Sequence, residues 1–402
     1  MRFRAWSALG LLGFGSGLPL LLTDSTLKLW LRSLHVDIAT IGFFALVQLP
    51  YNLKFLWAPF LDRFTPPLFG RRRGWLILTQ ALLATTLLWM AFGDPHGHLK
   101  LLAGLAVGLA FMSASQDTVT DAWRTEVLPQ DRQALGTAVH VSVYRVAMVV
   151  ATTGAVLIAA EYGWRAAYLA MAELMLLGLV GTLLAEEPEL DRPPRTLREA
   201  VVEPFRAFLQ RRGIWLALAF VILYKLGDQL ATSLTGPYFL DTGFSLAAIG
   251  LMSKGVGIPG LILGGFLSGW WMKKWPLRHG LMVCGLFQIA STLSLLLPAF
   301  FGAKLPVLAL SIALENIGYG MGVTVFMTLM MRLCDRHYTA TQFALLTSLG
   351  ALSRSLLAAP AGVVVKHTGW PVFFSICGIT AIPGLLMLLW WDRWGVPEDT
   401  AT

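Results

Sequence analysis

The chain has 402 residues, of which 56% are hydrophobic and 13% are charged, and it carries a net charge of +8. Soluble globular proteins have about 25% charged residues, so this composition excludes that class and predicts an all-α integral membrane protein. The positive charge does not indicate a nucleic-acid partner, because it is concentrated in connections on one side of the predicted spans. The three cysteines form no pair or metal-binding motif, and no cofactor or metal is expected.

Apolar runs long enough to cross a bilayer follow one another along the chain, since a helical span needs about 20 residues. They predict twelve transmembrane helices, with the bounds 5–27, 38–60, 74–93, 101–123, 133–159, 164–185, 213–238, 245–272, 279–299, 304–331, 340–365 and 370–391. The first run follows two arginines, as in a signal peptide, but it is too long and has no cleavage site. We therefore expect an uncleaved first helix.

Lysine and arginine in the connections predict the orientation of these helices. One side of the membrane holds the basic segments 63–73, 192–212 and 273–278. The connections of the other side hold only Lys28, Arg32, Lys100, Arg165, Lys304 and Lys366. Because cytoplasmic loops are enriched in positive charge, both termini are predicted to be cytoplasmic.

The longest connection, 186–212, separates six predicted helices from six. It begins with a linker composition and continues as an amphipathic run to Arg212, which predicts a surface helix. The two halves resemble each other, because a basic tight turn follows the second helix of each, as in transporters built from repeats. We therefore predict two six-helix bundles, 1–185 and 213–402, joined by a cytoplasmic linker.

The turn after the second helix resembles the signature loop of the major facilitator superfamily, Gly-x-x-x-Asp-Arg-x-Gly-Arg-Lys. Asp62-Arg63 and Gly70-Arg71-Arg72-Arg73 carry the resemblance. Ala58 stands where the first glycine is expected, and 65–69 are inserted. The candidate gating residues of this loop are Asp62, Arg63, Arg71 and Arg72.

Charged residues inside the predicted spans follow a period of three helices. Acidic ones lie on the first, fourth, seventh and tenth helices: Asp24, Asp117, Asp121, Asp228 and Glu315. Basic ones lie mostly on the second, fifth, eighth and eleventh: Lys54, Arg145, Lys225, Lys254 and Arg354. Because ionisable groups avoid lipid, the acidic helices are predicted to line a cavity with the basic helices beside it.

Asp117 and Asp121 are the leading candidates for proton coupling. Their spacing of four puts them on one helix face, about 6 Å apart along the axis. Two carboxylates so close in low dielectric favour a bound proton or a neighbouring cation. The alternative for Asp121 is a structural pair with Arg124 near cytoplasmic water.

Glu315 is the other candidate for proton coupling. It lies about 16 Å into its helix, and Lys225 lies about 18 Å into its own, so both are near the middle of the bilayer. Asp228 either takes part in the site or neutralises Lys225 one turn away. Neutral polar side chains suit sugars and amides, although each of them also suits a bond between helices. The predicted substrate-binding residues are Asn52, Lys54, Gln116, Tyr144, Arg145, Tyr224, Lys225, Asp228, Lys254, Asn316, Gln342 and Arg354.

Several segments, in order along the chain, resemble the AmpG muropeptide permeases. They are 13–19, 40–44, 54–57, 62–63 with 69–75, 113–117 with 121–123, 223–228, 315–316 and 340–346. The resemblance implies the major facilitator fold and a bacterial inner-membrane location. It also implies proton-driven import of N-acetylglucosaminyl-1,6-anhydro-N-acetylmuramyl peptides for peptidoglycan recycling, whose products induce β-lactamase.

Two other functions remain open from the sequence. The basic loop and Ser115-Gln116-Asp117 also resemble the acetyl-CoA transporters, so another anionic conjugate is an alternative substrate. A membrane-embedded acyltransferase needs a nucleophile and a base, and the spans offer only His140 and scattered serines. We therefore expect a transporter rather than an enzyme, with a small-molecule substrate, a proton and the lipid bilayer as its partners, and a monomeric state.

Overall fold

The computed structural model describes residues 3–36, 47–93, 99–188, 197–358 and 361–394. Within these ranges the regular secondary structure is helical and contains no strand, as the all-α prediction requires. Contacts divide the chain into two compact units. Unit 1 comprises Met1–Leu128, Val139–Pro204 and Asp335–Ser348, and unit 2 comprises Pro129–Ala138, Phe205–Cys334 and Leu349–Thr402. The predicted domain boundaries around the linker 186–212 stay a prediction.

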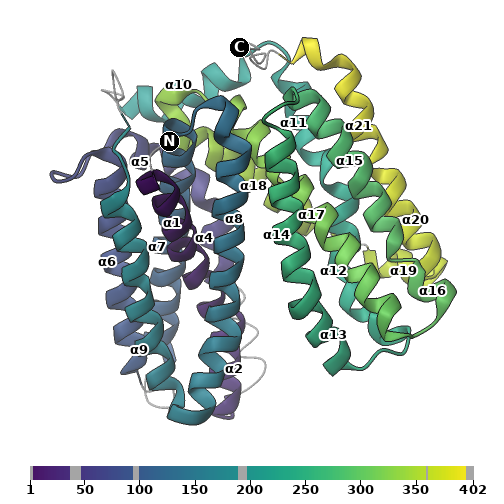
Figure 1. Ribbon diagram of the computed structural model, residues 1–402. Coiled ribbons are helices and arrows are strands. Elements are labelled where there is room, and N and C mark those ends of the chain that lie inside the picture. The colour runs from purple at the N-terminus through teal and green to yellow at the C-terminus, as the bar shows by residue number, and fades with distance from the viewer. Residues whose placement is uncertain (1–2, 37–46, 94–98, 189–196, 359–360, 395–402) are drawn as a thin grey trace. The chain divides into compact units, whose positions relative to one another are not determined.

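The long helices within each unit run side by side as a bundle (Figure 1). The first half of the sequence forms α1 (Phe3–Leu22), α2 (Ser25–Ser33), α4 (Leu49–Leu53), α5 (Ala58–Arg63), α6 (Arg71–Ala91), α7 (Leu99–Val127), α8 (Gln133–Val149), α9 (Ala155–Leu184) and α10 (Leu197–Leu209). The second half forms α11 (Ile214–Tyr224), α12 (Leu226–Asp241), α13 (Leu246–Met252), α14 (Ile258–Trp271), α15 (Leu277–Ser294), α16 (Leu297–Phe301), α17 (Leu305–Leu333), α18 (Thr339–Ala358), α19 (Ala361–Thr368), α20 (Trp370–Thr380) and α21 (Ile382–Met387).

Nine helical segments among the described residues are long and apolar enough to cross a membrane. One of them, Gln130–Leu184, is 55 residues long and contains two predicted spans, 133–159 and 164–185. Two further predicted spans, 38–60 and 340–365, include residues outside the description. The nine segments are therefore compatible with twelve spans.

Glycines of α1 allow close packing against α8 in unit 1. A Cβ on Gly13 would lie 2.5 Å from the carbonyl oxygen of His140, and one on Gly17 would lie 2.3 Å from that of Tyr144. Both distances are shorter than van der Waals contact, so a side chain at either position would push the helices apart. This packing places the backbone of His140 and Tyr144 directly against α1.

The predicted span 213–238 in unit 2 is interrupted by a turn. α11 ends at Tyr224 and α12 begins at Leu226, with Lys225 between them. Gly227 in the first turn of α12 packs on α20, where a Cβ would lie 2.1 Å from the carbonyl oxygen of Cys377. The turn therefore places Lys225 and Asp228 in the interior of the unit, where both are buried.

Candidate functional site

Asp117 and Asp121 lie one turn apart on α7 in unit 1. Asp121 accepts a hydrogen bond from Arg124 Nη2 at 2.9 Å, and its side chain is 17% exposed. The carboxylate of Asp117 interacts electrostatically with Lys54, Asp121 and Arg124. Lys54 is buried on the short helix η2 (Lys54–Leu56). The Asp117 Oδ1 atom is buried and makes no hydrogen bond. Asp121 thus forms the pair with Arg124, whereas Asp117 keeps a buried acceptor atom without a partner.

Neutral polar side chains extend this acidic centre towards α1. Gln116 Nε2 donates a hydrogen bond to Ser16 Oγ at 3.4 Å, and Ser16 Oγ donates to Thr120 Oγ1 at 3.5 Å. Buried atoms without a hydrogen-bond partner in this part of unit 1 include Tyr51 Oη, Ser113 Oγ, Gln116 Oε1, Asp117 Oδ1 and His140 Nδ1. Protein interiors leave few such atoms unsatisfied, so this group indicates a place for water or a polar ligand.

The remaining predicted binding residues of unit 1 lie on α8 and α4. Tyr144 on α8 lies within electrostatic reach of Asp117. Arg145, its neighbour, contacts the Met148 sulfur through Nη1 at 3.6 Å. Asn52 is half-buried on α4.

A second polar centre lies in unit 2. Lys225 Nζ donates to Asp228 Oδ2 at 2.9 Å, and both side chains are at most 5% exposed. The Lys225 ammonium also lies 4.7 Å from the ring centroid of Tyr319. The structure thus contains the neutralising pair that the sequence left as one alternative. A buried ion pair contributes little net free energy to folding, because the cost of desolvation offsets the attraction. The pair is therefore compatible with Asp228 taking part in the site and with Asp228 only neutralising Lys225.

Glu315 on α17 belongs to this second centre. Its Oε2 accepts from Asn316 Nδ2 at 2.9 Å, and its Oε1 accepts from Thr232 Oγ1 at 3.3 Å. Thr232 also donates to the backbone oxygen of Asp228 at 2.8 Å, which links the carboxylate to the ion pair. The centre therefore combines one cation and two carboxylates with neutral donors.

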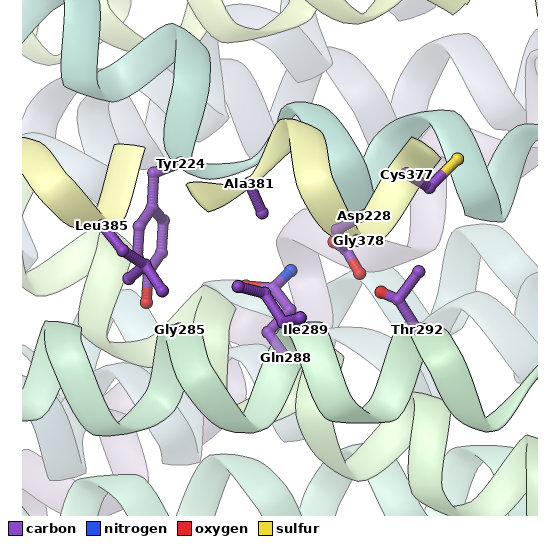
Figure 2. A pocket seen from close by; sticks show the side chains of 10 residues that line it. All are labelled: Tyr224, Asp228, Gly285, Gln288, Ile289, Thr292, Cys377, Gly378, Ala381 and Leu385. Carbon is purple, nitrogen blue, oxygen red and sulfur yellow. The ribbon is translucent and has the colours of Figure 1, made fainter. Parts of the chain in front are cut away.

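A small cavity adjoins this centre between α12, α15 and α20. The centre of a water molecule can occupy ≈ 10 Å³ of it. Gln288 lines it with both amide atoms buried and without a hydrogen-bond partner. Figure 2 shows Gln288 and Thr292 pointing from α15 towards α20, with the carboxylate of Asp228 near Thr292. Gln288 was missed by the sequence analysis, because a single amide in an apolar helix carries no distinctive pattern.

Of the remaining predicted binding residues, Tyr224 lines the same cavity and the others lie elsewhere. Tyr224 donates its hydroxyl to the carbonyl oxygen of Leu281 at 3.1 Å. Lys254 is exposed, on the π-helical turn Ser253–Gly257. Gln342 is engaged with the backbone, since its Oε1 accepts from the Asp335 amide at 2.6 Å and its Nε2 donates to the Pro204 oxygen at 3.3 Å. The side chain of Arg354 lies outside the described residues.

The sequence pattern of the Major Facilitator Superfamily matches residues 7–358. The chain belongs to this superfamily. It is 42% identical over 382 residues to the "Anhydromuropeptide permease" of Escherichia coli strain K12, covering 94% of this chain and 78% of the relative. It is 31% identical to the "Putative transporter AmpG 4" of Rickettsia felis, with 95% of each chain covered. The predicted resemblance is thereby confirmed, as is the prediction of a transporter.

Solved structures of the superfamily share the fold. FucP in the outward conformation matches with a TM-score of 0.73 at 14% identity, covering 96% of this chain and 98% of that one. The proton:xylose symporter XylE matches with a TM-score of 0.70, also at 14% identity, over 98% of this chain and 95% of that one. The major facilitator fold predicted from the sequence is therefore confirmed.

The superfamily's signature loop forms a buried charge cluster in unit 1. Arg72 is fully buried, and its Nη2 donates to Asp62 Oδ1 at 2.8 Å. Arg72 also pairs with Glu126 at the end of α7, as does Arg71 at 3.2 Å. Arg63 lies outside this cluster, with its guanidinium 5.1 Å from the ring of Phe64.

The same two carboxylates hold the first turn of α18. Asp62 Oδ2 accepts from the Thr341 amide at 2.8 Å and from the Thr341 hydroxyl at 2.7 Å, and its Oδ1 accepts from the Ala340 amide at 3.3 Å. Glu126 accepts a hydrogen bond from the Thr339 hydroxyl. A negative charge suits the amides at a helix start. Glu126 was not predicted, although an acidic residue at a helix end opposite an arginine-rich loop was the available signal.

Proposed function

We propose that this chain imports N-acetylglucosaminyl-1,6-anhydro-N-acetylmuramyl peptides across the bacterial inner membrane into the cytoplasm. The observation that carries this proposal is the 42% identity to the anhydromuropeptide permease over 94% of the chain. Import proceeds by alternating access, is driven by the proton gradient and uses a monomer with both termini in the cytoplasm. It serves peptidoglycan recycling.

The two polar centres suit the chemistry of this substrate. An anhydromuropeptide carries peptide carboxylates together with the hydroxyls and amides of a disaccharide. Lys54 and Lys225 are buried cations suited to carboxylates, and Gln116 and Asn316 offer amides suited to the sugars. The unpartnered Gln116 Oε1 supports this role, because a buried acceptor gains most from a ligand that donates to it.

Asp117 carries the coupled proton in this proposal, and Glu315 is the second candidate. Asp117 lies beside Lys54 and keeps an unpartnered Oδ1, whereas Asp121 is paired with Arg124. It takes up a proton from the periplasmic side and releases it towards the cytoplasm as the chain changes conformation.

The signature loop acts as a cytoplasmic gate in this proposal. Asp62 and Glu126 hold the first turn of α18, a helix whose residues beyond Ser348 belong to unit 2. Arg71 and Arg72 balance these carboxylates inside unit 1. Releasing α18 from this cluster would be one step of the transport cycle.

The test is uptake of labelled anhydromuropeptide into proteoliposomes that contain the purified protein. Asp117→Asn is expected to abolish accumulation driven by an imposed pH gradient while counterflow exchange continues, because exchange needs no net proton movement. Asp131→Asn is the control, since Asp131 is 67% exposed at its side chain. Normal gradient-driven accumulation by Asp117→Asn would exclude Asp117 as the proton carrier.

The same assay separates the substrate from its alternatives. Unlabelled anhydromuropeptide is expected to compete with the labelled compound, and acetyl-CoA is not. Absence of counterflow with the wild-type protein, or stronger competition by acetyl-CoA, would contradict the proposed substrate.

A further inference from the structure

A row of hydroxyl groups in unit 1 leads from one end of α1 to Asp117. Thr23 follows α1 directly, is fully buried and accepts a hydrogen bond from Gln48 Nε2 at 3.2 Å. The Tyr51 hydroxyl on α4 lies beside the hydroxyls of Thr23 and Ser113. Ser113 is fully buried on α7, and its spacing of four from Asp117 puts the two on one helix face.

The inner part of this row lacks formed hydrogen bonds. Tyr51 Oη, Ser113 Oγ and Asp117 Oδ1 are all buried, and none of the three makes a hydrogen bond. Adjacent unpartnered oxygens are costly unless water or a transferable proton joins them at some stage. These three atoms differ from isolated unpaired atoms because they follow one another along the row.

The outer end of the row adjoins solvent. Asp24, the neighbour of Thr23, pairs with Lys28, and the two side chains are 32% and 33% exposed. A carboxylate at a surface can exchange protons with water. We propose that Thr23, Tyr51 and Ser113 form a proton relay between this surface and Asp117, a proposal that rests on Asp117 as the carrier proposed above.

A hydroxyl group can both donate and accept a hydrogen bond, which is what a relay requires. The Thr23 hydroxyl donates to the Leu20 oxygen at 2.9 Å, so it first rotates towards Tyr51. A proton then enters at the Thr23 oxygen as that oxygen's own proton passes on, and the last transfer protonates Asp117 Oδ1. Every hydroxyl ends with the single proton it began with, so the net change is one proton gained by Asp117. Rotation of the hydroxyls restores the starting state.

The charges around Asp117 give the relay a direction. Lys54 from η2 and Arg124 from α7 bring positive charge near Asp117, and Asp121 brings negative charge. The neutral side chains that face it include Ser16 of α1 together with Tyr51 and Tyr144. Asp121 lies one turn and Arg124 about two turns further along α7, away from Ser113, and Asp121 is partly exposed. Proton entry past Ser113 and release past Asp121 therefore lie on opposite sides of Asp117 along α7.

The decisive variant is Tyr51→Phe, which removes the hydroxyl and keeps the ring. We expect it to slow gradient-driven accumulation of labelled anhydromuropeptide at least about tenfold, because a positioned proton donor contributes 10² or more to a rate. Counterflow exchange should stay within about twofold of wild type, since exchange moves no net proton. Tyr168→Phe is the matched control, because its hydroxyl, in the same unit, donates to the Leu22 oxygen instead, and both rates should be unchanged.

A second variant tests the relay as a single path. Ser113→Ala should give the same pattern, and the double variant Tyr51→Phe with Ser113→Ala should be no slower than the slower single variant, because one broken link already stops the path. Wild-type accumulation by Tyr51→Phe, or an equal loss of counterflow, would overturn the relay. Failure of the wild-type protein itself to accumulate the substrate would instead contradict the proposed function.

Discussion

Gln288 illustrates how much a single buried side chain can reveal. Both of its amide atoms are buried without a partner, beside a cavity with ≈ 10 Å³ for the centre of a water molecule. That volume is close to the smallest that holds one water, and the lining offers Asp228 and Thr292 as further polar partners. We therefore expect an ordered water to bind between these three side chains.

Replacing Gln288 by Leu tests this expectation. A hydrated amide loses favourable hydrogen bonds on replacement, so the melting temperature of the purified protein should fall by about 2–4 °C. If the cavity is dry, the change removes an unsatisfied polar group and the melting temperature should rise. A rise would therefore contradict the bound water.

The sequence predicted charged residues of the site better than neutral ones. Asp117, Asp228 and Glu315 stood out because a charge is rare in an apolar helix. Tyr51 and Gln288 did not, since hydroxyls and amides occur throughout such helices and only burial without a partner distinguishes them. That property depends on neighbours from other helices, which spacing along the chain does not predict.

Glycines determine how closely the helices of each unit approach. In unit 2, α14 meets α17 at Gly264, where a Cβ would lie 2.1 Å from the carbonyl oxygen of Ile317. The contact is with backbone, which cannot move aside as a flexible side chain can. Since α17 carries Glu315, the spacing between α14 and α17 also affects the geometry of the second centre.

Gly264→Ala should therefore destabilise the protein by about 1–3 kcal/mol, the usual cost of overpacking, measured as a lower melting temperature in detergent. Gly104→Ala on α7 is the control, because nothing lies within 4 Å of a Cβ there. The control should be neutral or slightly stabilising, since alanine favours helix more than glycine does. Equal effects of the two changes would show that packing at Gly264 is not limiting.

Helix positions followed from hydropathy, but breaks within helices did not. The span predicted at 304–331 is one helix, Leu305–Leu333, whereas the span predicted at 213–238 has a turn at Lys225. The turn depends on contacts such as Gly227 with the oxygen of Cys377. These partners are about 150 residues apart in the sequence, so a local apolar pattern contains no information about them.

At the scale of the whole molecule, the signature-loop cluster connects the two halves of the sequence within unit 1. Glu126 is 2% exposed at its side chain and accepts hydrogen bonds from Arg71, Arg72 and Thr339. Removing one member of a buried ion-pair cluster costs far more folding free energy than breaking an exposed pair, because the remaining buried charges lose their partner. The cluster is thus expected to stabilise the conformation described here.

Glu126→Gln should lower the free energy of unfolding by about 3 kcal/mol, because it removes the carboxylate that pairs with buried Arg71 and leaves buried Arg72 with Asp62 alone. It should also slow counterflow exchange, since the conformation described here is one state of the transport cycle and is destabilised by the change. Asp131→Asn is the matched control: Asp131 pairs with Arg132 at 3.4 Å, but both side chains are exposed, so little change is expected. Comparable losses for the two variants would contradict a special role for Glu126.

The pairing of Asp62 with α18 was beyond the sequence analysis. The loop's resemblance to the superfamily pattern predicted a gate but not its partner. Thr341 is 279 residues away from Asp62, and the resemblance of segment 340–346 to the permeases does not indicate which residue Thr341 contacts. The predicted linker helix, in contrast, was found, with α10 covering Leu197–Leu209 inside 186–212, because its amphipathic period is a local property.

The exchange of short segments between the units also affects how the chain matures. Unit 1 includes Asp335–Ser348, so it stays incomplete on the ribosome until more than three quarters of the chain has been made. Until then Asp62 and Glu126 have no threonine hydroxyls or helix amides from α18 to bind. A fragment that ends in the linker would keep the pairs of these carboxylates with Arg71 and Arg72 but would lack the hydrogen-bond donors of α18. It should therefore persist in cells only when the remaining fragment is synthesised alongside it.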